Sequence, residues 1–211
     1  MKKIVFTGGG TLGHVMPNLY LAQDLKNDYE IFYVGSSGIE KEKVKSANIK
    51  FEEIPSVKLV RGKFFVNLKI PFVLIKAIFS AKRILKRIKP NVVFSKGGYV
   101  ALPVVIAAKM LKIPVVAHES DFSFGLANKI ILKFCNTMCV NFANLEGKNK
   151  KIVYTGPIFS KNYESTLTNT TKLNLDLNKP TMLIVGGSLG CKIINERIAG
   201  FHVIGQKQII T

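Results

Sequence analysis

The chain has 211 residues, of which 47% are apolar, and a formal net charge of +18 at pH 7. This length and apolar content allow one full domain and part of another, and no apolar run is long enough to cross a bilayer. The three cysteines lack the paired spacing of a metal site, and the apolar run around Cys135 and Cys139 indicates core packing in a reducing environment.

The positive charge is concentrated between Glu53 and Glu119, a stretch with thirteen Lys or Arg and no Asp or Glu. Such a surface attracts polyanions, so an anionic membrane, a phosphorylated substrate and nucleic acid are the candidate partners. No nucleic-acid-binding module is recognisable, and nucleic acid is therefore not expected. A general preference for lysine in AT-rich genomes is the alternative explanation of the charge.

A glycine-rich turn follows the first predicted strand and precedes a helix-like segment at 17–25, part of a crossover helix expected over 15–26. Glycine lets the backbone approach a ligand closely, and the N–H groups at a helix start attract phosphate. Gly9 and Gly10 are therefore predicted phosphate-loop residues, although the spacing is not that of a dinucleotide site. His14 ends the turn and titrates near neutral pH, which makes it a candidate catalytic residue; local capping is the alternative.

Strands and helices alternate through residues 1–156, which predicts an α/β fold: a Rossmann-like parallel sheet with helices on both faces. After the first strand, further strands are expected at 30–34, 50–54, 90–94, 114–117, 137–140 and 152–154, with helices at 39–47, from 71, at 101–111 and at 126–134. Residues 157–179 are polar and predict a linker. Residues 180–211 repeat the strand–glycine–helix pattern and predict the beginning of a second Rossmann-like domain.

Two later strand ends also carry reactive or glycine-rich turns, at 97–99 and 118–121. Ligands of open α/β sheets bind outside the carboxyl ends of the strands, so these turns and His14 are expected to converge on one crevice. His118 and Glu119 lack a third ligand at helical spacing, and no metal site is predicted.

A basic and apolar segment, 60–89, precedes the fourth strand. Its helix has one stripe of small and aliphatic residues that can cover a sheet and a second apolar stripe beside lysines. Hydrocarbon side chains next to positive charge are typical of membrane-surface contacts, and a helix buried on two sides is the alternative. The predicted membrane patch consists of Phe64, Phe65, Leu68, Lys69, Phe72, Ile75, Lys76, Phe79 and Arg83.

Several motifs together resemble the MurG-type glycosyltransferases, in order and spacing over nearly the whole chain. The matching segments are 9–14 (GGTLGH), 97–99 (GGY), 118–121 (HESD), 125–129 (GLANK) and 186–190 (GGSLG) with Asn195. The resemblance implies two facing Rossmann-like domains of the GT-B type. It also implies that the first domain binds a lipid-linked acceptor, that the second binds the nucleotide, and that no metal or other cofactor is used.

The resemblance also implies roles for individual residues. His14 is the candidate general base, with Glu119 as its rival or partner. The implied substrate-binding residues are Thr11, Leu12, Gly13, Tyr99, Asp121, Asn128 and Ser188, and the phosphate-loop glycines are Gly9, Gly10, Gly97, Gly98 and Gly187. Leu12 stands where the family usually has Gly or Ala, Asp121 where it usually has Asn, and the turn 156–159 lacks the family's arginine.

The expected activity is an inverting hexosyl transfer from UDP-N-acetylglucosamine to undecaprenyl-diphosphate-linked muramoyl-pentapeptide, the step from lipid I to lipid II of peptidoglycan synthesis. It would take place at the cytoplasmic face of the bacterial cell membrane. Because the family's acidic and glutamine residues of the second domain are absent from this sequence, the alternative is a non-catalytic or partner-dependent, membrane-associated acceptor-binding fragment.

Overall fold

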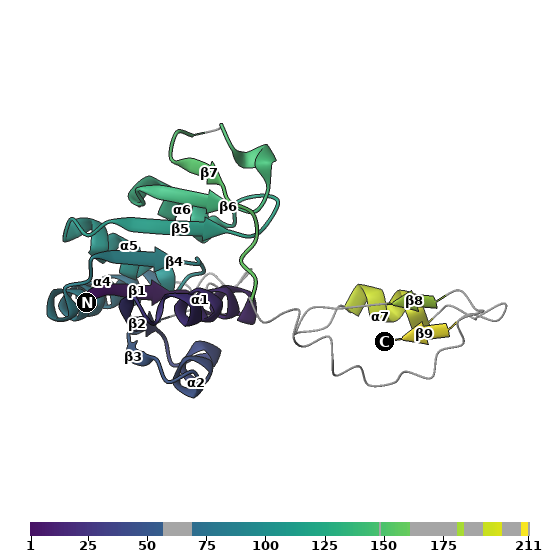
Figure 1. Ribbon diagram of the computed structural model, residues 1–211, viewed down its shortest axis with the longest axis horizontal. Helices are drawn as coiled ribbons and strands as arrows, with labels where there is room; N and C mark the ends of the chain where they lie inside the picture. Colours follow the sequence, from purple (N-terminus) through teal and green to yellow (C-terminus); the bar gives the residue numbers. More distant parts are fainter. Residues whose placement is uncertain (57–68, 148, 161–180, 184–191, 200–207, 211) are drawn as a thin grey trace. The chain divides into compact units, whose positions relative to one another are not determined.

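The computed structural model describes residues 1–56, 69–147, 149–160, 181–183, 192–199 and 208–210. They belong to two compact units, 1–161 and 162–211. The first unit contains a seven-stranded sheet in the order β3-β2-β1-β4-β5-β6-β7, which Figure 1 shows as one stack. All six neighbouring pairs are parallel, which confirms the predicted α/β fold. The strands are β1 (Lys2–Thr7), β2 (Tyr29–Gly35), β3 (Lys50–Glu53), β4 (Val92–Ser95), β5 (Val115–Glu119), β6 (Thr137–Val140) and β7 (Ile152–Tyr154).

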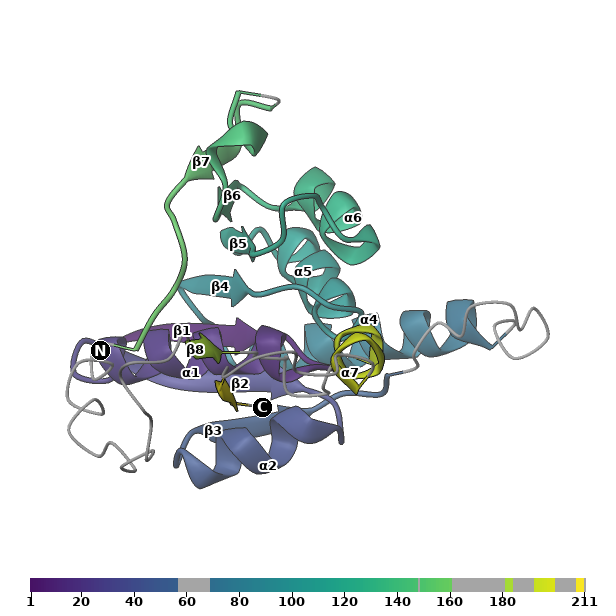
Figure 2. The same cartoon turned by 90° about the vertical axis from the view of Figure 1, so that its right-hand side faces the viewer.

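Helices cover both faces of this sheet, because successive strand side chains point to opposite faces. Val5 belongs to a core cluster with residues of α4, α5 and α6, whereas Phe6 belongs to a second cluster with residues of α1 and α2. Figure 2 shows α5 and α6 side by side on one face of β4, β5 and β6. The helices are α1 (Leu12–Leu25), α2 (Ile39–Ser46), α4 (Ile70–Ile88), α5 (Ala101–Met110) and α6 (Leu126–Phe134), followed by a short 3-10 helix, Ala143–Leu145.

Helix α1 begins at Leu12, three residues before the start predicted at 15, so the predicted start was wrong. Proline is favoured in the first turn of a helix because it lacks a backbone N–H, and Pro17 is beyond that turn. Inside α1 it removes one helical hydrogen bond, and the carbonyl that loses its donor belongs to the exposed Gly13, where water can replace it. The earlier start places His14 within the first turn of α1.

Helix α4 has one buried and one exposed apolar side, as its two stripes predicted. Its inward stripe is 0 to 8% exposed and comprises Ala77, Ala81, Ile84 and Ile88. Phe72, Ile75 and Phe79 are 76, 53 and 63% exposed. The alternative of a helix buried on two sides is therefore wrong for these three residues.

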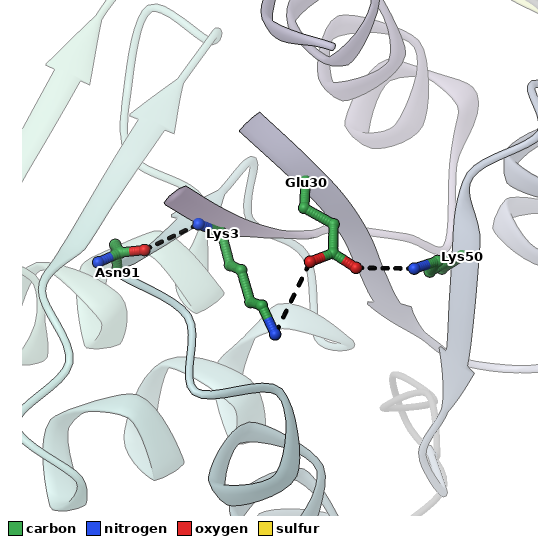
Figure 3. Close-up of polar contacts among 4 residues, drawn as sticks. All are labelled: Lys3, Glu30, Lys50 and Asn91. Carbon is green, nitrogen blue, oxygen red and sulfur yellow. Dashed lines mark hydrogen bonds and ion pairs between the residues drawn. The ribbon is translucent and has the colours of Figure 1, made fainter. Parts of the chain in front are cut away.

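Polar contacts join three strands and the turn before β4 at the amino edge of the sheet (Figure 3). Glu30 on β2 pairs with Lys50 on β3 at 2.7 Å and with Lys3 on β1 at 3.7 Å. The Asn91 side chain, just before β4, accepts a hydrogen bond from the Lys3 backbone N–H at 2.8 Å. These contacts lie at the end of the strands opposite the predicted site.

The second unit has a parallel pair, β8 (Thr181–Leu183) and β9 (Gln208–Ile210), and the helix α7 (Lys192–Ala199). Strand, helix and parallel strand in this order form one unit of an α/β fold. The linker at 157–179 and the start of a nucleotide-binding domain at 180 stay predictions. Gly187 and Ser188 lie outside the described residues.

Candidate functional site

Strands β1, β4 and β5 are neighbours, and the chain order of the sheet reverses between β1 and β4. The loops after these three strands therefore meet at one edge, as the sequence predicted. We call this the carboxyl edge and define it as residues 8–14, 96–100 and 118–125. Three helices, α1, α5 and α6, begin there, and none has a side-chain cap or an acidic residue in its first turn. Their N–H groups and dipoles can attract an anion.

His14 lies half-buried at the carboxyl edge, with Nδ1 3.2 Å from the Gly9 carbonyl oxygen and 3.1 Å from Thr11 Oγ1. A carbonyl only accepts, so Nδ1 carries the hydrogen and the lone pair of the neutral ring is on Nε2. Burial, and then the positive charge of Lys96, lower the pKa of His14. The imidazole is thus a neutral proton acceptor near neutral pH.

The glycine turn after β1 rests on buried polar side chains. Asn18 donates to the Thr7 carbonyl at 3.1 Å and to the Tyr33 hydroxyl at 3.2 Å, and Tyr33 donates to the Gly8 carbonyl at 2.8 Å. Asn18 and Tyr33 are fully buried. Burial raises the pKa of Tyr33, so its hydroxyl keeps the proton that it donates. Hydrogen bonds from these buried side chains therefore fix the position of the turn.

A buried carboxylate, Glu40 on α2, supports the same turn. Its Oε2 accepts from the Gly10 N–H at 3.3 Å, and its Oε1 accepts from the Ser36 N–H at 3.0 Å and from the Ser36 hydroxyl. A Cβ at Gly9 would lie 2.5 Å from Glu40 Oε1, and one at Gly38 would lie 2.9 Å from Oε2. The lack of a side chain at Gly9 therefore leaves room for the Glu40 carboxylate.

The turn after β4 brings Lys96, Gly97 and Gly98 against the neighbouring loops. A Cβ at Gly98 would lie 2.6 Å from the Gly9 carbonyl oxygen and 3.1 Å from His14 Nδ1, and its φ is +83°. A Cβ at Gly97 would lie 2.5 Å from Asn128 Oδ1. The Tyr99 ring lies against Gly10 in the same way, since a Cβ at Gly10 would lie 2.6 Å from a carbon of that ring. These glycines allow the turns to touch.

Glu119, the rival candidate for the base, is 5% exposed and holds the loop after β5. Its Oε1 accepts from the Asp121 N–H at 3.0 Å, and its Oε2 accepts from the Gly125 N–H at 3.1 Å and from Asn128 Nδ2 at 3.0 Å. Asn128 is 4% exposed and also donates to the His118 carbonyl at 3.3 Å. With both oxygens engaged, Glu119 is placed to shape the loop.

His118 is buried beside this loop, with Nε2 3.3 Å from the Gly156 carbonyl oxygen. Nε2 therefore carries the hydrogen, while the buried Nδ1 has no partner in the described part of the chain. Burial and the charge of Lys96 lower the pKa of His118 to about 4. The ring is neutral at physiological pH.

The structure brings most of the predicted site residues together at the carboxyl edge. Thr11, Gly13 and Asp121 are exposed there, and Leu12 and Tyr99 are half-buried. Asn128 is buried on α6, next to this edge, where it contacts Glu119. Of the predicted membrane patch, the residues at 64, 65 and 68 lie outside the described segments. Lys69, Lys76 and Arg83 are exposed.

Sequence reasoning missed Glu40 and Lys96. The sequence offered one signal for Lys96, namely its place between a buried strand and a pair of glycines. For Glu40 the signal was weaker, namely an acidic residue just after the glycine turn that ends β2.

Neither a metal cluster nor a membrane-spanning helix is found in the described residues. There, no three His, Cys, Asp or Glu side chains could together hold a metal ion. Within the same residues, no helix is both long and apolar enough to cross a bilayer.

Solved structures with the same fold include glycosyltransferases. The fold class is that of a Rossmann-like domain of the GT-B type. The crystal structure of MurG from Acinetobacter baumannii is 31% identical, with a TM-score of 0.70 over 94% of this chain and 54% of that one. A kitacinnamycin glycosyltransferase has the same TM-score at 11% identity, which shows the fold alone.

Residues 4–140 match the glycosyltransferase family 28 N-terminal domain, and the chain belongs to this family. A relative from Clostridium botulinum strain Langeland is 50% identical over 202 residues. It is named UDP-N-acetylglucosamine–N-acetylmuramyl-(pentapeptide) pyrophosphoryl-undecaprenol N-acetylglucosamine transferase. A relative of the same name from Clostridium novyi is 46% identical. The chain spans 57% of the length of each of these two relatives.

Proposed function

We propose that this chain carries the acceptor-binding half of an inverting hexosyltransferase. The donor would be UDP-N-acetylglucosamine and the acceptor undecaprenyl-diphosphate-linked muramoyl-pentapeptide, as the names of the relatives suggest. The observation that carries the proposal is His14, a neutral imidazole held at the meeting point of three strand ends and an uncapped helix start.

In the proposed reaction, His14 Nε2 takes the proton of the muramoyl hydroxyl. The hydroxyl oxygen then attacks the anomeric carbon of the donor sugar, and the bond from that carbon to the diphosphate oxygen breaks. UDP leaves with the electron pair, and the configuration at the anomeric carbon inverts. The N–H groups at the helix starts would stabilise diphosphate charge, and Glu119 would hold the loop that carries Asp121.

The test uses a chimera in which residues 1–160 of this chain replace the matching part of the Clostridium botulinum relative. His14→Ala should lower kcat by about 100-fold or more, because general-base catalysis contributes factors of that size. Gln23→Ala, an exposed change on the same helix, is the control and should leave kcat unchanged. Equal turnover of His14→Ala and the parent chimera would remove His14 from the proposed role.

Acceptor binding is measured on the 211-residue chain itself, by calorimetry with a short-chain lipid acceptor. The chain should bind the acceptor, and His14→Ala should retain most of that affinity, since the base acts mainly in the transition state. Acceptor binding without turnover in the parent chimera would favour the second candidate function, a non-catalytic acceptor-binding module.

Membrane association is part of the proposal, at the cytoplasmic face, and the exposed side of α4 supports it. Phe72 and Phe79 each precede an exposed basic residue, Lys76 and Arg83, by four positions along α4, a spacing that places side chains on the same side of a helix. Inserting about half of a phenylalanine side chain is worth about 1 kcal/mol. The double change of Phe72 and Phe79 to Ser should therefore weaken binding to vesicles with anionic lipid by roughly 20- to 30-fold.

The control for vesicle binding is Phe159→Ser, a change at a phenylalanine that is 70% exposed and far from α4 in the sequence. It should bind the vesicles as the parent chain does. If both changes weaken binding equally, general surface hydrophobicity and not α4 holds the chain on the membrane.

A further inference from the structure

Ser120, the residue that follows β5, has no part in the proposed reaction, yet its side chain contacts a buried charge. Its Oγ accepts a hydrogen bond from Nζ of Lys96, the residue that follows β4. Lys96 is 1% exposed, and the ion pairs found among the described residues do not include it. An ammonium group is rarely buried with so little compensation, so the contact with Ser120 calls for an explanation.

The contact with Lys96 decides which way the Ser120 hydroxyl hydrogen points. An ammonium group has three donors and no acceptor, so the hydroxyl oxygen accepts and its own hydrogen is left to donate to another group. Lys96 is buried while Ser120 is half-buried, and the free hydrogen is therefore on the more open side of the pair. The positive charge behind the oxygen polarises the O–H bond and makes it a stronger donor.

The backbone around Ser120 is held as firmly as its side chain. The Ser120 carbonyl accepts from Asn141 Nδ2 at 3.2 Å, and the Asn141 N–H donates to the Glu119 carbonyl at 3.1 Å. The Asp121 N–H donates to Glu119 Oε1 at 3.0 Å. A donor that is oriented before its ligand arrives loses little conformational entropy on binding. Ser120 is thus suited to recognise one particular oxygen atom.

The carboxylates on either side of Ser120 decide the class of ligand. Glu119 precedes it and Asp121 follows it, and like charges placed together are costly, so a phosphate oxygen is a poor ligand at this point. The Glu119 oxygens already accept from N–H groups of the protein, whereas Asp121 is exposed and can accept from a ligand. A neutral group with an acceptor for Ser120 and a donor for Asp121 is the best match.

A secondary amide has this combination, because its carbonyl oxygen accepts and its N–H donates. Both sugars in the name of the relatives carry an N-acetyl group, which is a secondary amide. We propose that Ser120 binds the carbonyl oxygen of a substrate N-acetyl group, and that Lys96 is a positioning residue for the Ser120 hydroxyl. The inference rests on the proposed function, which supplies one such group on the donor and one on the acceptor.

The test uses the chimera described above and pairs of substrates with and without the N-acetyl group. The donor arm compares UDP-N-acetylglucosamine with UDP-glucosamine. The acceptor arm compares the short-chain lipid acceptor with the same lipid lacking the acetyl group of its muramoyl sugar. A protonated amine donates and does not accept, so it offers nothing to the Ser120 hydroxyl.

In the arm that varies the bound N-acetyl group, Ser120→Ala should lower kcat/KM for the acetylated substrate by about 10-fold or more. For the deacetylated substrate, kcat/KM should stay within about 2-fold of the parent value, because the lost hydrogen bond was never made. In the other arm both substrates should lose equally, since their common partner is acetylated. The arm with the unequal loss therefore identifies the sugar that Ser120 contacts.

Three further variants separate binding from structure. Ser120→Thr keeps the hydroxyl and should keep the preference of the parent for the acetylated substrate. Lys96→Met removes the charge that orients the hydroxyl, and it should reduce the same preference by a smaller factor than Ser120→Ala. Ser46→Ala, a change at an exposed serine at the end of α2, is the control and should leave kcat/KM unchanged for every substrate.

A loss of folded protein lowers kcat/KM equally for all substrates, so the comparison within one variant is independent of it. If Ser120→Ala does not fold, Ser120→Cys replaces it, because a thiol is only a weak donor. Equal losses for acetylated and deacetylated substrates in both arms would overturn the proposal and leave Ser120 a structural role alone. Absence of turnover in the parent chimera would instead refute the proposed glycosyl transfer, and this inference with it.

Discussion

Glu40→Ala is expected to destabilise the first unit by about 3 to 5 kcal/mol, a large effect for one change in the first turn of an eight-residue helix. The Glu40 carboxylate is fully buried and accepts from the Ser36 N–H, the Ser36 hydroxyl and the Gly10 N–H. Each buried donor that loses a partner costs about 1 to 3 kcal/mol. Water that enters the vacated space would recover part of the sum, so we take the lower end of the total.

The matched control is Glu42→Ala, in the same first turn of α2 but exposed. Both carboxylates interact with the helix dipole, a contribution of about 0.3 to 1 kcal/mol that cancels in the comparison. Urea unfolding of the two variants and the parent gives the free energies of unfolding. The free energy of unfolding should fall by at least about 2 kcal/mol more in Glu40→Ala than in Glu42→Ala.

Equal losses in the two variants would refute this reasoning. They would mean that the Gly10 N–H and the Ser36 groups find other partners at no cost. Gly9 and Gly38 would then need an explanation other than room for the Glu40 carboxylate.

Three further predictions concern the same unit. Gly98→Ala should cost about 2 kcal/mol more than Gly147→Ala in urea unfolding, because both glycines have positive φ but only Gly98 has atoms within 4 Å of an added Cβ. Because the pKa of His118 is lowered to about 4 on folding, the unfolded chain binds more protons between about pH 4 and 6.5, and stability falls as the pH is lowered through that range. When the pH is lowered from 6.5 to about 4.5, the free energy of unfolding of His118→Gln should therefore fall by about 1 to 2 kcal/mol less than that of the parent. An equal fall in both proteins would contradict the lowered pKa of His118. Glu30→Gln should change the melting temperature by only about 2 °C, since the ion pairs of Glu30 with Lys3 and Lys50 are exposed. In about 0.5 M salt, which screens exposed charges, the change should disappear. A large change that does not depend on salt would show that these ion pairs contribute more to stability than exposed pairs usually do.

The sequence predicted the fold closely because its signals are local. The helix α6 and the strands β6 and β7 have the predicted bounds, and the other predicted strands of the first unit differ by one or two residues. Apolar runs between glycine or proline turns specify buried parallel strands, and alternation with helices specifies their connections. The start of α1 was predicted three residues too late, and the helix includes Pro17 because solvent can replace the lost hydrogen bond.

The site was predictable only in part. His14 and the turns 97–99 and 118–121 could be placed together, because the ends of parallel strands share one edge. Glu40 could not be assigned, since its contact with Gly10 depends on how α2 packs against the loop after β1, thirty residues away in the sequence. Tertiary packing of this kind leaves no periodic signal.

The contacts at the carboxyl edge also change how its glycines are understood. Gly9 and Gly10 were predicted to hold phosphate, yet Gly9 faces the Glu40 carboxylate and the Gly10 N–H already donates to it. A phosphate there would compete with a buried negative charge for one donor. Leu12 and Gly13 are in the first turn of α1, where helical N–H groups lack intrahelical partners, and the nearest atom to a Cβ at Gly13 is Thr11 Oγ1 at 3.8 Å. We therefore propose that an anionic ligand would meet the backbone at the start of α1, where N–H groups lack intrahelical partners, and that the glycine pair before it supports the Glu40 carboxylate.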